Sequence, residues 1–275
     1  MTESLWQSAR PGAFTRFFKL RELFWQFTWR EVQGRYRGSY LGLFWALLTP
    51  FCMLAAYTFV FNVIFKARWA EDPRDNWLDF ALRLFSGIIV FNVFAESVTA
   101  APLLIVRNPN YVKKVVFPLE ILPASTAGAA VIHSLVGWVI VLLGVFVTDH
   151  RLYWTSLYLP LLYVPLIALT LGVCWFVAAL GVFLRDLPQV VTVLVQLLMF
   201  LSPVFYSMKS VPEHVRPAFE VNPLSVIIES FRRCVVLGRT PDWLGLGVVT
   251  AVSLVAMLAG YVWFMKLKWA FADVI

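Results

Sequence analysis

The chain has 275 residues, of which 60% are hydrophobic and 14% are charged, and its mean hydropathy is +0.77. Soluble domains carry about 25% charged residues, so this composition predicts an integral membrane protein and leaves no room for a separate soluble domain. The net charge of +7 needs no nucleic acid to explain it, because anionic lipid and the orientation of membrane spans both favour a basic excess.

The chain begins with a polar segment followed by an amphipathic one. Residues 1–12 lack an apolar core before a small-residue cleavage site, so no cleavable signal peptide is predicted. Between Phe14 and Tyr36, a helical period gathers aromatic side chains on one face and basic side chains such as Lys19 and Arg30 on the other. This pattern predicts an interfacial amphipathic helix on the inner leaflet, which either only anchors the chain or also docks a cytoplasmic partner.

Residues 35–50 mark the entry into the membrane. Arg35 and Arg37 precede Gly38, and no charged side chain occurs from Leu41 to Phe65. A helix needs about 20 apolar residues to cross a bilayer. A first span is therefore predicted here, with its basic end toward the cytoplasm.

The hydropathy pattern predicts an all-α membrane protein with six transmembrane helices, so both termini lie on the same side. With the termini inside, the inner segments hold thirteen basic and six acidic residues, and the outer segments hold ten and nine. The positive-inside rule then places both termini in the cytoplasm. The expected single domain, 1–275, consists of a cytoplasmic N-terminus (1–40), spans at 41–65, 84–106, 121–147, 157–184, 190–207 and 243–265, and a tail (266–275).

The inner loop 107–120 is unlike a simple tether. It mixes aromatic, basic and apolar residues between two prolines, which predicts a short helix with an apolar face that fills a groove on another protein. The alternative is a solvated basic loop that only obeys the orientation rule. The residues nominated for this contact are Pro109, Asn110, Tyr111, Val112, Lys113 and Lys114.

The outer segment 208–242 is too polar for a full span and too apolar for a free loop. It predicts a pair of short re-entrant helices, which are tolerated only where they are buried in protein or line a cavity. We expect these helices to cap an opening and to act as an exit gate. The residues nominated for the gate are Asn222, Pro223, Glu229 and Arg232.

The sequence offers no catalytic or metal-binding motif. Its three histidines, His133, His150 and His214, lie in different segments, so no metal site and no catalytic function of the chain itself are predicted. Glu96 is the one acid within a span, where an acid faces the protein interior or water. It either forms hydrogen bonds between helices, with Asn92 or Ser97, or lies near the end of an exit path, and a proton-relay role lacks partners.

The spans are rich in aromatic residues, which pack in the core, face lipid or line a path. An aromatic path suits a sugar chain, because pyranose rings present apolar C–H faces that stack on aromatic rings. The residues nominated for the path, on the first and fifth spans, are Trp45, Phe51, Tyr57, Phe59, Phe200 and Tyr206.

Several segments together carry a family resemblance. They are RYRGSYLGLFWALLTP, RNPNYVKKVVFPLEILP, RDLPQV and FLSPVFYSMKSVP, followed by NPLSVIIESFRRCVVLG. In this order they resemble the transmembrane permease subunit of polysaccharide-exporting ABC transporters over nearly the whole chain. The O-antigen exporters are most similar, and the capsule and teichoic-acid exporters come next.

The resemblance implies a homodimer in the bacterial inner membrane, with two copies of a separate ATPase subunit that binds ATP and Mg²⁺. The chain itself would bind no cofactor. The substrate would be a finished polysaccharide on an undecaprenyl-diphosphate lipid, driven through a channel between the two membrane subunits. The interfacial helix and the 107–120 loop would transmit the motion. A membrane-embedded glycosyltransferase or acyltransferase is the alternative from a different class.

The basic entry to the first span yields a testable prediction about the head group of the substrate. Guanidinium offers planar, paired donors to a diphosphate, whereas orientation and general lipid attraction need only charge. We therefore expect the double variant Arg35→Lys, Arg37→Lys to express normally but to show reduced export and reduced substrate-stimulated ATP hydrolysis. Full export by this variant would contradict paired recognition of the diphosphate. The two arginines would then serve only the orientation of the chain and its attraction to anionic lipid.

Overall fold

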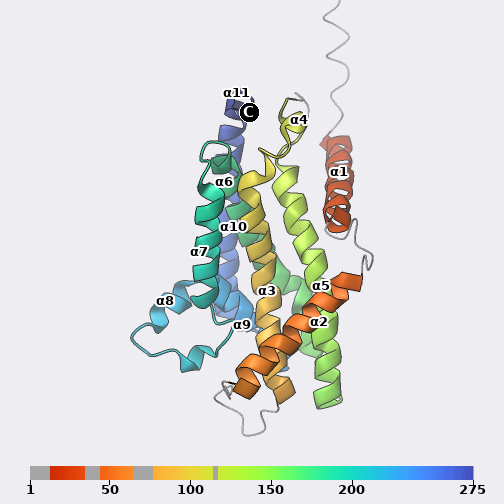
Figure 1. Cartoon of the computed structure of the whole chain (residues 1–275), viewed down its shortest axis with the longest axis vertical. Coiled ribbons are helices and arrows are strands. Elements are labelled where there is room, and N and C mark those ends of the chain that lie inside the picture. The colour runs from red at the N-terminus through yellow and green to blue at the C-terminus, as the bar shows by residue number, and fades with distance from the viewer. Residues whose placement is uncertain (1–12, 35–43, 65–76, 114–116, 275) are drawn as a thin grey trace, which may run out of the picture.

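The computed structural model describes residues 13–34, 44–64, 77–113 and 117–274. Within these ranges the chain is helical and contains no β-strand. Figure 1 shows the long helices side by side, with α4 and the C-terminal α11 at one end of the bundle. The long helices are α3 (Trp77–Leu104), α5 (Ile121–Asp149), α6 (Leu159–Gly181) and α10 (Trp243–Leu267), and the shorter ones are α1 (Ala13–Gly34), α2 (Trp45–Thr58), α4 (Pro109–Val112), α7 (Leu187–Phe200), α8 (Arg216–Val221), α9 (Pro223–Val235) and α11 (Phe271–Val274).

In the described ranges, four helices are long and apolar enough to cross a membrane, and they correspond to the second, third, fourth and sixth predicted spans. A 3₁₀ turn, Trp154–Tyr158, leads into α6, and another, Lys268–Ala270, joins α10 to α11. Helix α3 begins at Trp77, before the predicted start at residue 84. The earlier residues include Asp79 and Arg83, which the hydropathy pattern excluded, but Arg83 is buried in the folded chain.

The first and fifth predicted spans are represented by the shorter helices α2 and α7. Each has 14 residues, or about 21 Å at 1.5 Å per residue, against a hydrocarbon core of about 30 Å. A π-helix, Phe59–Ile64, extends α2, and Figure 1 shows α2 running obliquely in front of α3 and α5. Helix α7 ends at Phe200, before the predicted residue 207, because turns that include Pro203 follow it.

Helix α3 is the centre of the bundle. It packs against α5, α6, α7, α9 and α2, and 78% of its most apolar window is buried. Apolar residues such as Leu82, Leu84 and Ala101 are fully buried. These five elements are therefore arranged around one helix, whose C-terminal end leads to α4.

Helices α6 and α10 make the most extensive contact in the chain, and two glycines permit it. A Cβ atom at Gly260 would lie 2.0 Å from the carbonyl oxygen of Gly172, and one at Gly172 would lie 2.5 Å from that of Ala256. Small residues let the backbones of membrane helices approach closely, so that van der Waals contact holds them together.

The segment after α7 contains two short helices, α8 and α9, as predicted. Asn222 caps the N-terminus of α9, because its side chain accepts a hydrogen bond from the Leu224 amide at 3.0 Å, and Pro223 lies in the first turn. It packs against α3, α6 and α10, and Ile227, Ile228 and Phe231 are fully buried. The burial of α9 agrees with the requirement for a re-entrant helix, although its position in a membrane stays a prediction.

Helix α1 covers most of the predicted amphipathic segment and packs against α5. Phe27, Thr28 and Val32 are buried, whereas Trp25 and Trp29 are exposed and lie 6.4 Å apart. Figure 1 shows α1 near the end of the bundle that carries α4 and α11. Its location at a membrane surface stays a prediction.

The contact between α6 and α10 predicts opposite effects for two Gly→Ala substitutions on α10. Gly260→Ala forces the two backbones apart, and overpacking of this kind costs about 1–3 kcal/mol in the free energy of unfolding. Gly247→Ala is the matched control, because nothing lies within 4 Å of a Cβ there and alanine stabilises a helix by about 0.5–1 kcal/mol over glycine. Thermal unfolding of the purified chain measures both, and equal midpoints for the two variants would contradict the packing argument.

Candidate functional site

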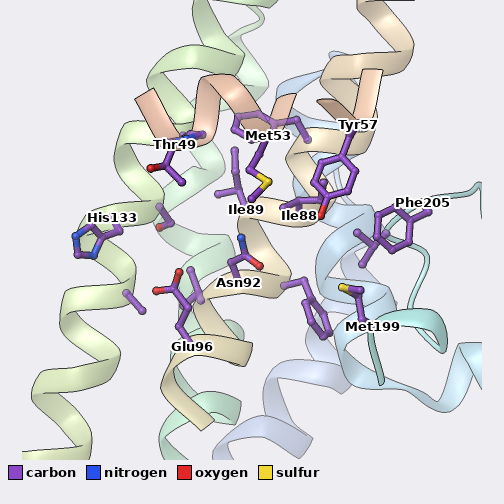
Figure 2. A pocket seen from close by; sticks show the side chains of 18 of the residues that line it. Thr49, Met53, Tyr57, Ile88, Ile89, Asn92, Glu96, His133, Met199 and Phe205 are labelled. Atoms are coloured by element: carbon purple, nitrogen blue, oxygen red, sulfur yellow. The ribbon is translucent and has the colours of Figure 1, made fainter. Parts of the chain in front are cut away.

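A cavity of about 400 Å³ lies between α2, α3, α5 and the segment that follows α7. Figure 2 shows it from close by, with Thr49, Met53 and Tyr57 on α2 facing residues of α3. Its walls combine aromatic rings with a small number of polar groups, a composition typical of sites for small organic ligands. The aromatic residues are Trp45, Tyr57, Phe85, Phe91 and Phe205, and the polar ones are Thr49, Asn92, Glu96, His133 and Ser134.

The polar wall of the cavity comes from two neighbouring helices. Asn92 and Glu96 are one turn apart on α3, so their side chains share a face of that helix. His133 and Ser134 follow one another on α5. Figure 2 shows the side chains of Asn92 and Glu96 close to each other on α3, and His133 on the helix beside them. In the sequence, Glu96 is the one acid within a predicted span and has no evident ionisable partner. In the fold, His133 lines the same cavity.

A buried hydrogen-bond network supports the α5 wall. The hydroxyl groups of Ser134 and Tyr163 are hydrogen-bonded to each other, and the Trp138 indole donates to the Tyr163 oxygen at 3.0 Å. The ring of Phe231 on α9 lies 5.3 Å from both the Trp138 ring and the Tyr163 ring. The wall is thus fixed to α6 and α9, which limits its freedom to rearrange.

The six nominated path residues do not all meet. Trp45 and Tyr57 line the cavity, whereas Phe51, Phe59 and Phe200 are 59%, 58% and 62% exposed on the outside of this chain. Tyr206 donates a hydrogen bond to the Phe200 carbonyl, and its ring lies 6.1 Å from that of Phe219.

Phe205, which was not nominated, lines the cavity, and its ring lies 5.9 Å from that of Tyr57. Phe205 and Tyr206 belong to the same predicted span, and the sequence pattern does not tell which of two neighbouring aromatic residues faces a path.

Two of the nominated gate residues, Glu229 and Arg232, belong to a network centred on Arg232. This side chain is fully buried and donates hydrogen bonds to the carbonyl oxygens of Arg83 at 3.1 Å and Pro203 at 2.8 Å. It also forms an ion pair of 2.8 Å with Glu229. A Cβ at Gly87 would lie 2.9 Å from the Arg232 Nη2, so the guanidinium uses space that a larger residue would fill.

Asn222 ties the start of α9 to the same region. Its Nδ2 donates to the Ser202 hydroxyl at 2.9 Å and to the Leu201 carbonyl at 3.1 Å. Pro223 follows it as the first residue of α9. Arg232 and Asn222 therefore both hold the turns after α7, from opposite parts of α9.

The two predicted coupling elements, the amphipathic helix and the loop after α3, contact each other. The Arg30 guanidinium donates a hydrogen bond of 2.9 Å to the Tyr111 hydroxyl and lies 4.2 Å from the centre of the Phe27 ring. The Tyr111 ring stacks on Phe117 at 4.5 Å and meets Phe27 edge-on at 5.5 Å. We name Phe27, Arg30, Tyr111 and Phe117 the inner aromatic cluster, and it joins α1 to α4.

The remaining coupling residues differ in exposure. Asn110 and Lys113 are exposed, whereas Pro109 and Val112 are half-buried. Lys114 lies outside the described residues, as do the head-group candidates Arg35 and Arg37. Tyr111 belongs to the inner aromatic cluster, so of the described coupling residues only Asn110 and Lys113 are exposed.

A second interaction fixes the loop at its other end. The Glu120 carboxylate pairs with Lys268 at 2.8 Å, and the Glu120 carbonyl accepts from the Trp175 indole at 3.0 Å. Lys268 lies in the turn between α10 and α11, and Phe271 of α11 is fully buried against Phe264. The loop after α3 is thereby connected to α1, α6 and the C-terminal tail.

Within the described parts of the chain, no three His, Cys, Asp or Glu side chains gather in a way that would hold a metal ion. His150 and His214 are exposed and lie in separate segments. Cys174 and Cys234 are buried and Cys52 is exposed, and all three are free.

The sequence is similar to proteins of one transporter family. The model of the ABC-2 type transporter family matches residues 22–236. The O-antigen export system permease proteins RfbA of Klebsiella pneumoniae and Myxococcus xanthus are 25% and 26% identical to the chain, over 90% and 93% of it and 92% and 96% of their own lengths. The polysialic acid transport protein KpsM of Escherichia coli is 24% identical over 84% of this chain and 88% of its own.

The network around Arg232 predicts a severe and specific loss of stability. Arg232→Met takes the cation from Glu229, which is 36% exposed, and leaves the buried Pro203 carbonyl without its guanidinium donor. An unsatisfied buried group of this kind typically costs about 1–3 kcal/mol in the free energy of unfolding. Arg239→Met is the control, because Arg239 is exposed and such substitutions change stability by about 0.5 kcal/mol or less. Thermal unfolding and the yield of monodisperse protein distinguish the two, and a wild-type midpoint for Arg232→Met would contradict this role.

Proposed function

Because the chain belongs to the ABC-2 type transporter family, we propose that it is the permease subunit of an ATP-driven exporter of lipid-linked polysaccharide, of the O-antigen type. The observation that carries this proposal is the similarity to O-antigen export permeases along nearly the full length of both chains. The relatives named for polysialic acid transport align over a smaller share of the chain, which favours the O-antigen class over the capsule class. The lipid is undecaprenyl diphosphate, as the resemblance of the sequence implies.

The proposed assembly contains two copies of this chain and two copies of a separate ATPase that binds ATP and Mg²⁺. The chain lacks a phosphate-binding Gly-rich loop, which agrees with ATP hydrolysis in another subunit. Phe51, Phe59 and Phe200 are large apolar side chains that this chain leaves exposed. Between two copies, they would extend the aromatic path beyond the cavity that holds Trp45 and Tyr57.

The proposed orientation places both termini in the cytoplasm. Figure 1 shows α1, α4 and α11 near the same end of the bundle, and the basic excess of the sequence lies on the corresponding segments. The exposed residues Asn110 and Lys113 then face the cytoplasm, where the ATPase binds. Arg35 and Arg37 are proposed to meet the lipid diphosphate. Asn222, Pro223, Glu229 and Arg232 are proposed to form the exit gate on the other side.

Deletion and complementation test this function. We expect deletion of the chain to remove a polysaccharide from the cell surface and to leave it lipid-linked inside the cell, because the polymer is finished before export. Wild-type chain should restore export. A membrane-embedded transferase would instead leave no finished polymer inside the cell, and no ATPase would be needed for its activity.

The complementation also tests the coupling surface. Lys113→Glu should fold but restore little export, because loss of an interface hot spot costs about 2 kcal/mol, or roughly 30-fold in affinity. Arg151→Glu is the matched control, an exposed basic residue in the outer segment after α5. Co-purification with the ATPase and surface polymer are the readouts. Normal assembly and export by Lys113→Glu would refute the coupling role of this residue.

A further inference from the structure

The polar wall of the cavity has no role in the function proposed so far. Asn92, Glu96 and His133 are strongly polar groups on two helices that are long and apolar enough to cross a membrane. Polar residues at such positions are expensive to keep in a membrane protein and mark sites of function. These three polar groups line the same cavity as several aromatic rings. This arrangement indicates a ligand-binding site.

The chemistry of the wall fits a sugar ring. A pyranose has apolar C–H faces, which pack against aromatic rings, and a rim of hydroxyl groups, which both donate and accept hydrogen bonds. Trp45, Tyr57 and Phe205 supply the aromatic surface, and the carboxyl, amide and imidazole groups across from it supply matching donors and acceptors. The volume of about 400 Å³ lies near the lower end of the range for sites that hold small organic ligands, about 300–1,000 Å³.

We propose that this cavity binds an uncharged sugar unit of the transported polymer, an inference that rests on the proposed export function. Glu96 and Asn92 bond the hydroxyl rim, His133 completes the polar wall, and the rings of Tyr57 and Phe205 cover an apolar face of the sugar. The network of Ser134, Tyr163 and Trp138 holds the α5 wall in place, so the site is formed before the ligand enters.

The charges of the wall select against acidic sugars. Its lining residues, all within the described parts of the chain, include an acid at Glu96 but no Lys or Arg. A sugar carboxylate would enter this site beside another acid and without a guanidinium or ammonium partner, and burial of an unpaired charge is strongly unfavourable. The site therefore accepts uncharged sugars, including uncharged N-acetylated ones, and rejects sialic and uronic acids.

A crosslinking experiment in the complete transporter tests occupancy. A photoreactive benzoylphenylalanine replaces Met53, which lines the cavity, and in a control it replaces Val255, which is 66% exposed on α10. During export we expect the Met53 site to form adducts that carry the polymer over its full range of lengths, and the Val255 site to form none. Adducts that carry only a short lipid-linked sugar, or none while export continues, would overturn the inference.

A binding experiment tests selectivity in the purified complex with its ATPase, in nanodiscs free of glycolipid. Saturation-transfer NMR compares a tetrasaccharide of N-acetylglucosamine with a tetrasaccharide of sialic acid. We expect signal from the neutral probe and at least tenfold less from the acidic one. Glu96→Leu and Asn92→Leu should each weaken the neutral signal by about tenfold, because each removes a hydrogen bond to the sugar.

Thr99→Val is the matched control on α3, because the Thr99 hydroxyl bonds the carbonyl of Ala95 in its own helix at 2.6 Å and Thr99 does not line the cavity. Equal signals from the two probes, or an unchanged signal in both leucine variants, would overturn the proposal. Such a result, obtained while the transporter still exports polymer, defeats only the sugar site. A deletion strain that exports polymer normally would instead defeat the proposed function on which the site rests.

Discussion

The structure depends on hydrogen bonds to backbone carbonyl groups in the turns where α7 ends. In a membrane interior an unpaired carbonyl costs several kcal/mol, so irregular backbone persists only where the protein supplies donors. Arg232 supplies them to Pro203 and, on α3, to Arg83, and Glu229 balances its charge. One buried guanidinium therefore lets α7 end early and holds α9 against α3. Without it, the turns after α7 and the helix that covers them would have no common anchor.

The cavity follows from the same arrangement. Because α7 stops at Phe200, the chain turns back and places Val204 and Phe205 in the cavity wall instead of continuing as a helix. Arg232 bonds the carbonyl beside Val204, and Phe231, next to it, contacts Trp138 and Tyr163 behind the α5 wall. Two walls of the cavity are thus fixed by neighbouring residues of α9, so the proposed gate and the proposed sugar site share their support.

Much of the fold was predictable from the sequence, but the meeting of distant residues was not. Hydropathy located the helices α3, α5, α6 and α10 because a bilayer demands long apolar runs, and the mixed polarity of 208–242 predicted α8 and α9. The same argument could not extend α3 back to Trp77, since Arg83 looks unfavourable until its burial is seen. The argument also could not predict that Glu96 and His133 line one cavity. The two residues lie on different helices, and hydropathy carries no information on which helix faces meet. The aromatic content led to the nomination of Trp45 and Tyr57. It could not show which residues beyond the break after Phe200 face the cavity.

The position of α3 gives the proposed function a physical route between its parts. Its last turn leads directly to α4 and so to Tyr111, which Arg30 and Phe27 bind to α1. Two turns before that end it carries Glu96 in the cavity, and near its start the Arg83 carbonyl accepts the bond from Arg232. A helix packed on most sides moves as a unit, because close-packed interiors transmit displacement instead of absorbing it. A push on the inner aromatic cluster by an ATPase would therefore reach the sugar site and the gate together, through one continuous element and without a separate relay.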